Sequence, residues 1–232
     1  RQTVIPGLIS SVLYILIFGF TLEQRISSIE GISYTIFIIP GLIMMNTLTN
    51  ASSNPSSSLL QMKLTGQVPD LMQAPLSSLE ISLAFIVGGV VRGVVNGILI
   101  LLIGMWIGGM EVLYPIATIG FIFVVSVAFS SMGLLLGQLA DTWDQLATMQ
   151  NFFLTPLSFL GGIFYSVNML PDWAQTISAF NPIYYMINGL RYTTLGFSDS
   201  DPQYSFVIAL LMSIGLSFLS LIHISEPTRL WH

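Results

Sequence analysis

The sequence predicts an all-α integral membrane protein. Of its 232 residues, 53% are hydrophobic and 7% are charged, and the mean hydropathy is +0.82. Soluble domains carry about 25% charged residues, so too few charges remain here to cover a water-exposed surface. A membrane-spanning helix needs about 20 apolar residues, and the chain therefore has room for roughly six such helices in one domain.

Six apolar stretches are long enough for these spans. The first covers residues 4–21. The second, residues 34–49, contains Pro40 and Gly41, which predict a kink that neighbouring helices can accommodate. The other four spans are predicted at residues 81–107, 115–139, 146–165 and 204–222.

A long polar segment, residues 50–78, follows the second span and starts with a serine-rich run. Pro69 ends a short helical pattern in this segment and can begin another helix, with Asp70 in its first turn. From spacing alone, a solvated loop with a short surface helix is the simpler interpretation. The apolar positions that recur three or four residues apart are Leu60, Leu64, Val68 and Leu71.

The third span carries a ridge of small residues. Gly89, Gly93 and Gly97 recur every four positions, which favours close approach of another helix. Gly133 and Gly137 form a similar pair in the fourth span. We therefore expect these helices to pack tightly.

Arg92 lies within the glycine ridge, about 16 Å along the helix from Ile81 at about 1.5 Å per residue. An arginine near the middle of a bilayer costs at least about 2.5 kcal/mol, so it must face protein, water or another polar group. Asn46, Asn96 and backbone carbonyls are the expected partners. Two interpretations stay open: a residue that lines or couples a pathway, and a buried hydrogen-bonding strut between helices.

Two acids, Asp141 and Asp144, lie three apart in a short turn before the fifth span. Such a pair could serve acid–base chemistry or a metal ion. A helix cap is the better interpretation, because neither a histidine nor a third acid accompanies them.

The inventory of chemistry-bearing residues excludes most enzymatic classes. Cysteine is absent, and both histidines, His223 and His232, lie in the last ten residues. The sequence contains neither HExxH nor GxSxG nor the GxxxxGK[ST] phosphate-binding loop. A single lysine argues against a nucleic-acid-binding face. We therefore expect no catalytic, cofactor or metal site on this chain.

An aromatic segment follows the fifth span and breaks into two short pieces. Pro171 opens the first piece and Pro182 the second, as suits the first turn of a helix. Trp173 and Tyr184 are residue types that gather where hydrocarbon meets water. We predict two short interfacial or re-entrant helices at one membrane surface.

An ordered series of motifs runs along the chain: FIIPGLIMM, KLTGQVPDLMQAPLSSLE, GGVVRG, TPLSFLGGIFYS, LPDWAQ and NPIYYMINGLRYTTLG. This series resembles the ABC-2 family of transporter permeases, the membrane halves of bacterial ATP-driven exporters. The resemblance implies six membrane helices in residues 1–222, a multi-pass position in the bacterial inner membrane and an N-terminus inside. It also implies an ATP-binding partner subunit that holds ATP and Mg²⁺, and a second permease chain, identical or homologous.

The resemblance assigns roles to three groups of residues. A cytoplasmic coupling helix that contacts the ATPase is implied for Lys63, Leu64, Gly66, Val68, Pro69, Asp70, Leu71 and Ala74. External helices between spans five and six are implied for Pro171, Trp173, Asn181, Pro182, Tyr184 and Arg191. The third group is the intramembrane set of Gly89, Arg92, Gly93 and Gly97. The cargo implied is amphipathic: a polysaccharide, a lipid-linked sugar or a drug-like molecule.

The two ends of the chain depart from this pattern. Family members begin with an amphipathic surface helix, and we expect that segment to be missing here. Residues 223–232 contain ISEPTRL, which resembles a translated sequencing adaptor, and we expect this tail to be non-native.

Other functions stay open from the sequence. An ATP-independent channel or secondary transporter could use Arg92 as its substrate or ion site, and this predicts an internal repeat, of which we find none convincing. An intramembrane enzyme lacks the necessary residues. A structural membrane scaffold is a further alternative. The positive-inside rule gives a tie and decides no orientation.

Overall fold

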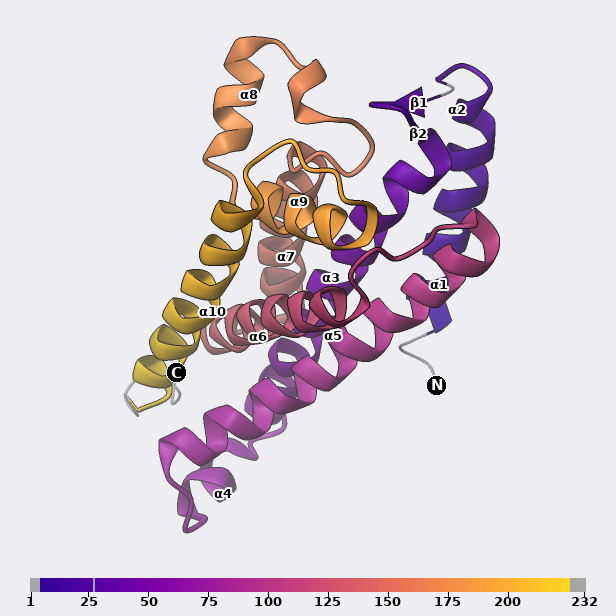
Figure 1. Ribbon diagram of the computed structural model, residues 1–232. Helices are drawn as coiled ribbons and strands as arrows, with labels where there is room; N and C mark the ends of the chain where they lie inside the picture. The colour runs from indigo at the N-terminus through magenta and orange to yellow at the C-terminus, as the bar shows by residue number, and fades with distance from the viewer. Residues whose placement is uncertain (1–4, 27, 226–232) are drawn as a thin grey trace.

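The computed structural model describes residues 5–26 and 28–225, and within these ranges the chain is mostly helical (Figure 1). The predicted all-α class is therefore confirmed. The long helices are α3 (Tyr34–Leu64), α5 (Ser78–Gly108), α6 (Pro115–Leu139), α7 (Trp143–Leu160) and α10 (Pro202–Ser225). The shorter elements are α1 (Ile5–Tyr14), the π-helix η1 (Ile15–Phe20), α2 (Thr21–Glu23), α4 (Val68–Gln73), the 3₁₀ turn η2 (Val167–Met169), α8 (Asp172–Ala179) and α9 (Pro182–Leu195).

Among the described residues, four helices are long and apolar enough to cross a membrane: α3, α5, α6 and α10. The sequence predicts six spans, and the other two correspond to the α1–η1–α2 segment and to α7. The first of these is a shorter apolar helix, and α7 carries polar residues such as Asp144 and Gln150. The count of six therefore stays a prediction.

Helix α3 is the centre of the bundle. Its most apolar window is 83% buried, whereas that of α10 is only 22% buried. Helix α3 packs against both α5 and α6, and α6 in turn packs against α10. The peripheral helices expose large apolar side chains such as Val87, Phe123 and Phe218, as expected of surfaces that face lipid or another chain.

The predicted loop at residues 50–78 is wrong in its first half. Helix α3 continues through the serine-rich run and ends at Leu64, fifteen residues beyond the predicted end of the second span. Gly66, with φ +69°, then turns the chain, so the helical pattern predicted over residues 60–71 is split between α3 and α4.

Local hydrogen bonds make the serine-rich run compatible with a helix away from water. Ser56 Oγ donates to Ser52 O at 2.8 Å, and Ser57 Oγ donates to Ser53 O at 2.6 Å. Because each hydroxyl donates to a carbonyl of the preceding turn, it needs no water molecule as a hydrogen-bond partner. Small side chains then let neighbouring helices approach closely, as they do in membranes.

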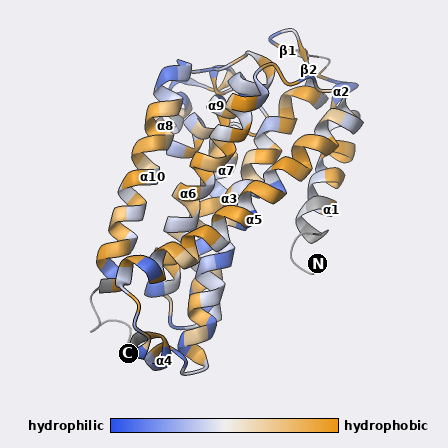
Figure 2. Cartoon of the chain, turned by 60° about the horizontal axis from the view of Figure 1, so that its bottom comes forward, coloured by the Kyte–Doolittle hydropathy of each residue, from blue (hydrophilic) through white to orange (hydrophobic). Residues whose placement is uncertain are grey.

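Figure 1 shows the two ends of the molecule. Helix α4 lies at one end, and α8 lies at the other with a small antiparallel hairpin formed by β1 (Ser28–Ile29) and β2 (Ile32–Ser33). Figure 2 shows that hydrophobic residues predominate along the long helices between these ends. This hairpin is not among the elements predicted from the sequence.

The predictions about the chain ends fall largely outside the described residues. Helix α10 extends to Ser225 and includes His223, but residues 226–232 are not described. Residues 1–4 are likewise outside the described part.

Candidate functional site

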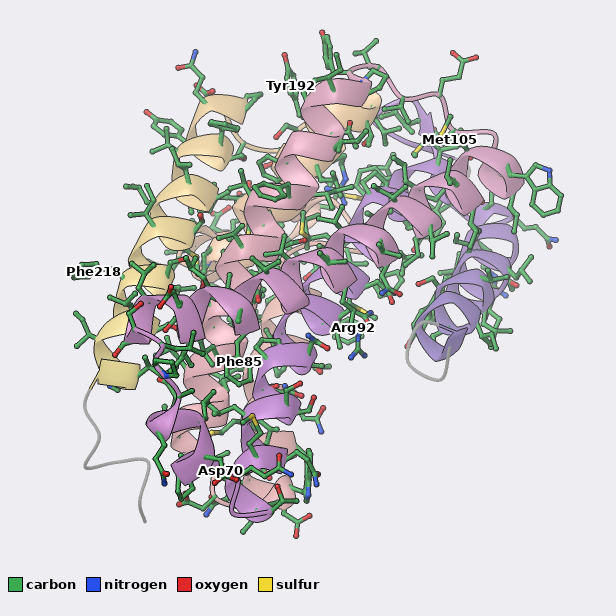
Figure 3. All side chains as sticks on the ribbon, turned by 90° about the horizontal axis from the view of Figure 1, so that it is seen from below. Asp70, Phe85, Arg92, Met105, Tyr192 and Phe218 are labelled. Atoms are coloured by element: carbon green, nitrogen blue, oxygen red, sulfur yellow. The ribbon has the colours of Figure 1, made fainter. Side chains whose placement is uncertain are left out.

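The turn between α3 and α5 presents the short helix α4 at one end of the molecule. Val68 is buried and Leu71 packs against an apolar cluster between α3, α5 and α6, so these two side chains anchor α4. Asp70 in its first turn is exposed, and Figure 3 shows it at the outer tip. Pro69 lies in the first turn of α4 and Ala74 is its C-cap. The exposed tip can therefore contact another protein while the apolar face keeps its position.

Lys63, in the last turn of α3, contacts other residues than α4 does. Its Nζ donates to Ala140 O at 2.7 Å and to Gln138 O at 3.1 Å, and it forms an ion pair with Asp141 at 3.1 Å. These carbonyls belong to the C-terminal end of α6, where the backbone lacks intrahelical donors. Lys63 thus ties the end of α3 to the turn between α6 and α7, and its neighbour Leu64 is exposed.

The middle of α5 contains the second group of polar residues. Arg92 is partly buried, and its Nε donates to Asn50 Oδ1 on α3 at 3.2 Å. Asn96 donates instead to the Arg92 backbone oxygen at 2.8 Å, and Asn46 donates to Ser11 Oγ on α1. Asn50, which is not among the expected partners, is therefore the residue that orients the guanidinium.

The glycines beside Arg92 lie where α5 meets α3 and α6. A Cβ on Gly93 would lie 2.8 Å from Ala51 Cβ, and one on Gly97 would lie 2.6 Å from Thr47 Oγ1. A Cβ on Gly89 would lie 2.6 Å from Ala51 O, the carbonyl that Pro55 leaves without its helical donor. The ridge therefore sets how closely the helices approach.

The opposite end of the molecule is built around the start of α9. Asn181 caps this helix, since its Oδ1 accepts from Ile183 N at 3.0 Å and its Nδ2 donates to Leu157 O of α7 at 2.6 Å. Pro182 occupies the first turn of α9, and Pro171 is the N-cap of α8. On α8 and its C-cap, apolar side chains lie exposed at helical spacing: Trp173, Ile177 and Phe180.

Arg191 and Asp199 form a buried cluster behind these helices. Both side chains are fully buried, with 3.7 Å between Nη1 and Oδ2. Arg191 Nη2 donates to Gly162 O at 2.7 Å, and the guanidinium lies 4.0 Å from the ring centroid of Phe37 on α3. Asp199 also accepts from Ser166 Oγ at 2.6 Å. The cluster thus joins α9 to α3 and to the loops on either side.

Burial governs the ionisation of this cluster. It lowers the pKa of Arg191 to about 10, while Asp199 acts in the opposite direction, so the guanidinium stays charged at neutral pH. Burial and the Asp199 charge raise the pKa of Tyr184 to about 12. Arg191 is therefore a buried cation that contacts the loops on either side of α9.

The sequence matches the family model of the ABC-2 type transporter over residues 1–195. The chain belongs to the ABC-2 type transporter family. The match covers α1 to α9 and includes the α4 turn, Arg92 with its glycines, and Arg191, whereas Asp199 follows the matched residues.

Similar proteins agree with this assignment. The ABC-2 chain is 40% identical to the inner membrane transport permease YadH of Escherichia coli K12, over 85% of this chain and 77% of YadH. It is 27% identical to the putative transport permease ycf38 of Cyanophora paradoxa, over 95% of this chain and 78% of that protein. It is 25% identical to nodulation protein J of Rhizobium leguminosarum bv. viciae, over 84% and 75% of the two chains. The chain is a multi-pass protein of the inner membrane.

Sequence reasoning missed two partners in this ABC-2 chain. Asp199 lies between the predicted external helices and the last predicted span and was not singled out, yet it is the carboxylate of the Arg191 cluster. Asn50 was placed in a polar loop, so it was not considered as the partner of Arg92. A four-residue repeat of polar residues, Asn46, Asn50, Asn54 and Ser58, was the signal that a helix continues there.

Proposed function

We propose that this chain is the permease subunit of an ATP-driven exporter that moves an amphipathic molecule out of the cytoplasm. Its cargo would be a polysaccharide, a lipid-linked molecule or a drug-like compound. A separate ATP-binding subunit would hold ATP and Mg²⁺, since the sequence contains no phosphate-binding loop. The second permease chain, identical or homologous, would complete the membrane pathway.

The observation that carries this proposal is the presentation of α4. The short helix is anchored by Val68 and Leu71 while Asp70 faces outward at the tip. This arrangement suits a contact that passes movement from an ATPase to α3 and α5, which flank the loop. Lys63 would pass the same movement to α6, because its Nζ holds the end of that helix.

The arrangement in the membrane follows from the same proposal. The α1–η1–α2 segment and α7 would join α3, α5, α6 and α10 to make six spans within residues 1–222. The N-terminus and α4 would lie in the cytoplasm, and α8 and α9 would lie at the external surface. Transport would be a shift between inward-facing and outward-facing states, which ATP binding at the partner biases.

A second function is favoured by one specific observation. Arg92 lies partly exposed in the middle of α5, and an intramembrane cation is by default a candidate for a substrate or ion site. An ATP-independent channel or secondary transporter would use Arg92 in this way.

Purification in mild detergent separates the two functions. If the chain is an exporter subunit, an ATP-hydrolysing protein copurifies in stoichiometric amount, and charge reversal at Asp70 weakens the association. A preparation that transports cargo down an ion gradient without any ATPase would establish the second function instead.

A further inference from the structure

Arg92 is an isolated cation at the centre of a membrane-spanning helix. It lies fourteen residues after Ser78 and sixteen before Gly108, the two ends of α5. Two ion pairs occur within residues 5–26 and 28–225, and neither includes Arg92. On α5 itself the nearest carboxylate, Glu80, lies about 18 Å away along the helix axis. Glu80 is also engaged by Ser77, whose backbone N and Oγ are each 2.7 Å from its Oε2.

The guanidinium is held at one edge, and the described residues leave its other edge without a partner. In the described part of the chain, its side chain makes one hydrogen bond, from Nε to Asn50 Oδ1 at 3.2 Å. Asn50 is itself fixed, because its Nδ2 donates to Asn46 O at 3.0 Å. This leaves the two terminal nitrogens of Arg92 without a protein acceptor among the described residues. They form the planar fork that recognises carboxylates and phosphates in a bidentate manner.

A polar stripe leads from Arg92 toward the α4 end of the molecule. Asn50, Asn54 and Ser58 follow each other at four-residue spacing on α3 and so share one face. Asn54 and Ser58 line a pocket of about 300 Å³ between α3, α4 and α5. Gly88 of α5 makes room for this stripe, since a Cβ there would lie 3.0 Å from Asn54 Nδ2.

The Arg92 side chain is only partly buried. Figure 3 shows its side chain leaving α5 on the side away from α10. The apolar flank of the pocket includes Leu71, Leu76 and Phe85. A molecule with an apolar chain and an anionic head could therefore contact these side chains and the polar stripe together. Glu80 lines the pocket and would repel a second negative charge there. We therefore place the anionic group at Arg92 and the apolar chain in the pocket.

We propose that Arg92, oriented by Asn50, binds the phosphate or carboxylate group of an anionic amphiphile within the membrane. The site would give the transporter a preference for anionic over zwitterionic head groups. Its role as a cargo site depends on the proposed export function, whereas the binding itself does not. Binding and association with an ATPase can therefore fail independently.

The test uses the full chain in phosphatidylcholine nanodiscs and follows its thermal unfolding. Dodecyl phosphate should raise the unfolding temperature in a saturable manner, and dodecylphosphocholine at the same concentration should not. Arg92→Gln should weaken the apparent affinity for dodecyl phosphate at least about tenfold, as expected for loss of a charged hydrogen-bond donor. Arg92→Lys, which keeps the charge, should bind more tightly than Arg92→Gln.

Arg25→Gln is the matched control, because Arg25 is an exposed arginine outside the predicted spans. Its affinity for dodecyl phosphate should equal that of the unaltered chain. Equal stabilisation of the unaltered chain by dodecyl phosphate and dodecylphosphocholine would overturn the proposal, as would unchanged affinity in Arg92→Gln. The first of these comparisons needs no variant and so holds even if Arg92→Gln fails to fold.

A second arm identifies the source of the anion. Part of the phosphatidylcholine is replaced by phosphatidylglycerol, and inorganic phosphate is tested separately. Competition between phosphatidylglycerol and dodecyl phosphate would assign the site to a bilayer lipid head group. Saturable binding of dodecyl phosphate without such competition would assign it to a separate anionic amphiphile. Equal binding of inorganic phosphate would contradict the need for an apolar chain.

Discussion

Arg191 Nη1 lies 3.7 Å from Asp199 Oδ2, and both side chains are fully buried. Removal of one partner from a buried ion pair leaves an uncompensated charge and costs about 3–5 kcal/mol. We predict that Asp199→Asn destabilises the detergent-solubilised chain by about 3–5 kcal/mol, which should appear as a lower unfolding temperature. Asp172→Asn, at an exposed position on α8, is the control. Similar unfolding temperatures for the two variants would contradict a structural role for the cluster.

At the other end of the molecule, the contacts of Lys63 predict that two variants differ in stability. Asp141 is 60% exposed, so its ion pair with Lys63 should contribute only about 0–1 kcal/mol. Lys63→Met also leaves the Gln138 and Ala140 carbonyls without their donor, which should cost about 1–3 kcal/mol. Lys63→Met should therefore unfold at a lower temperature than Asp141→Asn. The reverse order would show that the carbonyl contacts do not stabilise the fold.

Gly133 tests the close packing of α6 on α3. A Cβ at this position would lie 2.6 Å from Ser52 Cα, so the backbones must separate to accept it. We expect Gly133→Ala to destabilise the chain by about 1–3 kcal/mol. Gly120 on the same helix has open space around its Cβ position, and Gly120→Ala should leave stability unchanged or slightly raised. Equal effects at the two glycines would argue against tight packing at Ser52.

The proposed orientation can be measured because the chain has no cysteine. Asp70→Cys and Asp172→Cys each introduce a single exposed thiol, at opposite ends of the molecule. In intact cells, an impermeant maleimide should label the Asp172→Cys variant. The Asp70→Cys variant should react only after the membrane is permeabilised. Labelling of Asp70→Cys in intact cells would reverse the orientation.

The long apolar helices could be predicted from the sequence because hydrophobic length alone indicates them. The prediction for α6 has the observed bounds, Pro115–Leu139, and that for α5 differs by one to three residues at each end. Sequence reasoning failed at residues 50–64, where Ser52 and Ser56 read as a polar loop. The Ser56 hydroxyl donates to the preceding turn of α3, and the backbone at Ser52 and Ser56 packs against Gly133 and Gly137, which hydropathy does not reveal.

The candidate site was predictable only in its local parts. Pro182 and Asn181 mark the start of α9, because caps depend on neighbouring residues. The contacts of Lys63 with residues near 140, and of Arg92 with Asn50, join positions 42 to 78 residues apart. Such pairs depend on how the helices pack, which a single sequence does not contain.

The central claim is that α4 contacts an ATP-binding subunit, and crosslinking in native membranes tests it most directly. The Asp70→Cys and Asp172→Cys variants are expressed in a host that supplies the natural partners, and a short thiol-to-amine crosslinker is added. We predict a crosslinked product that contains an ATP-binding protein from Asp70→Cys and none from Asp172→Cys. An ATP-binding protein crosslinked from neither variant, or only from Asp172→Cys, would contradict the assignment of α4 as the coupling element.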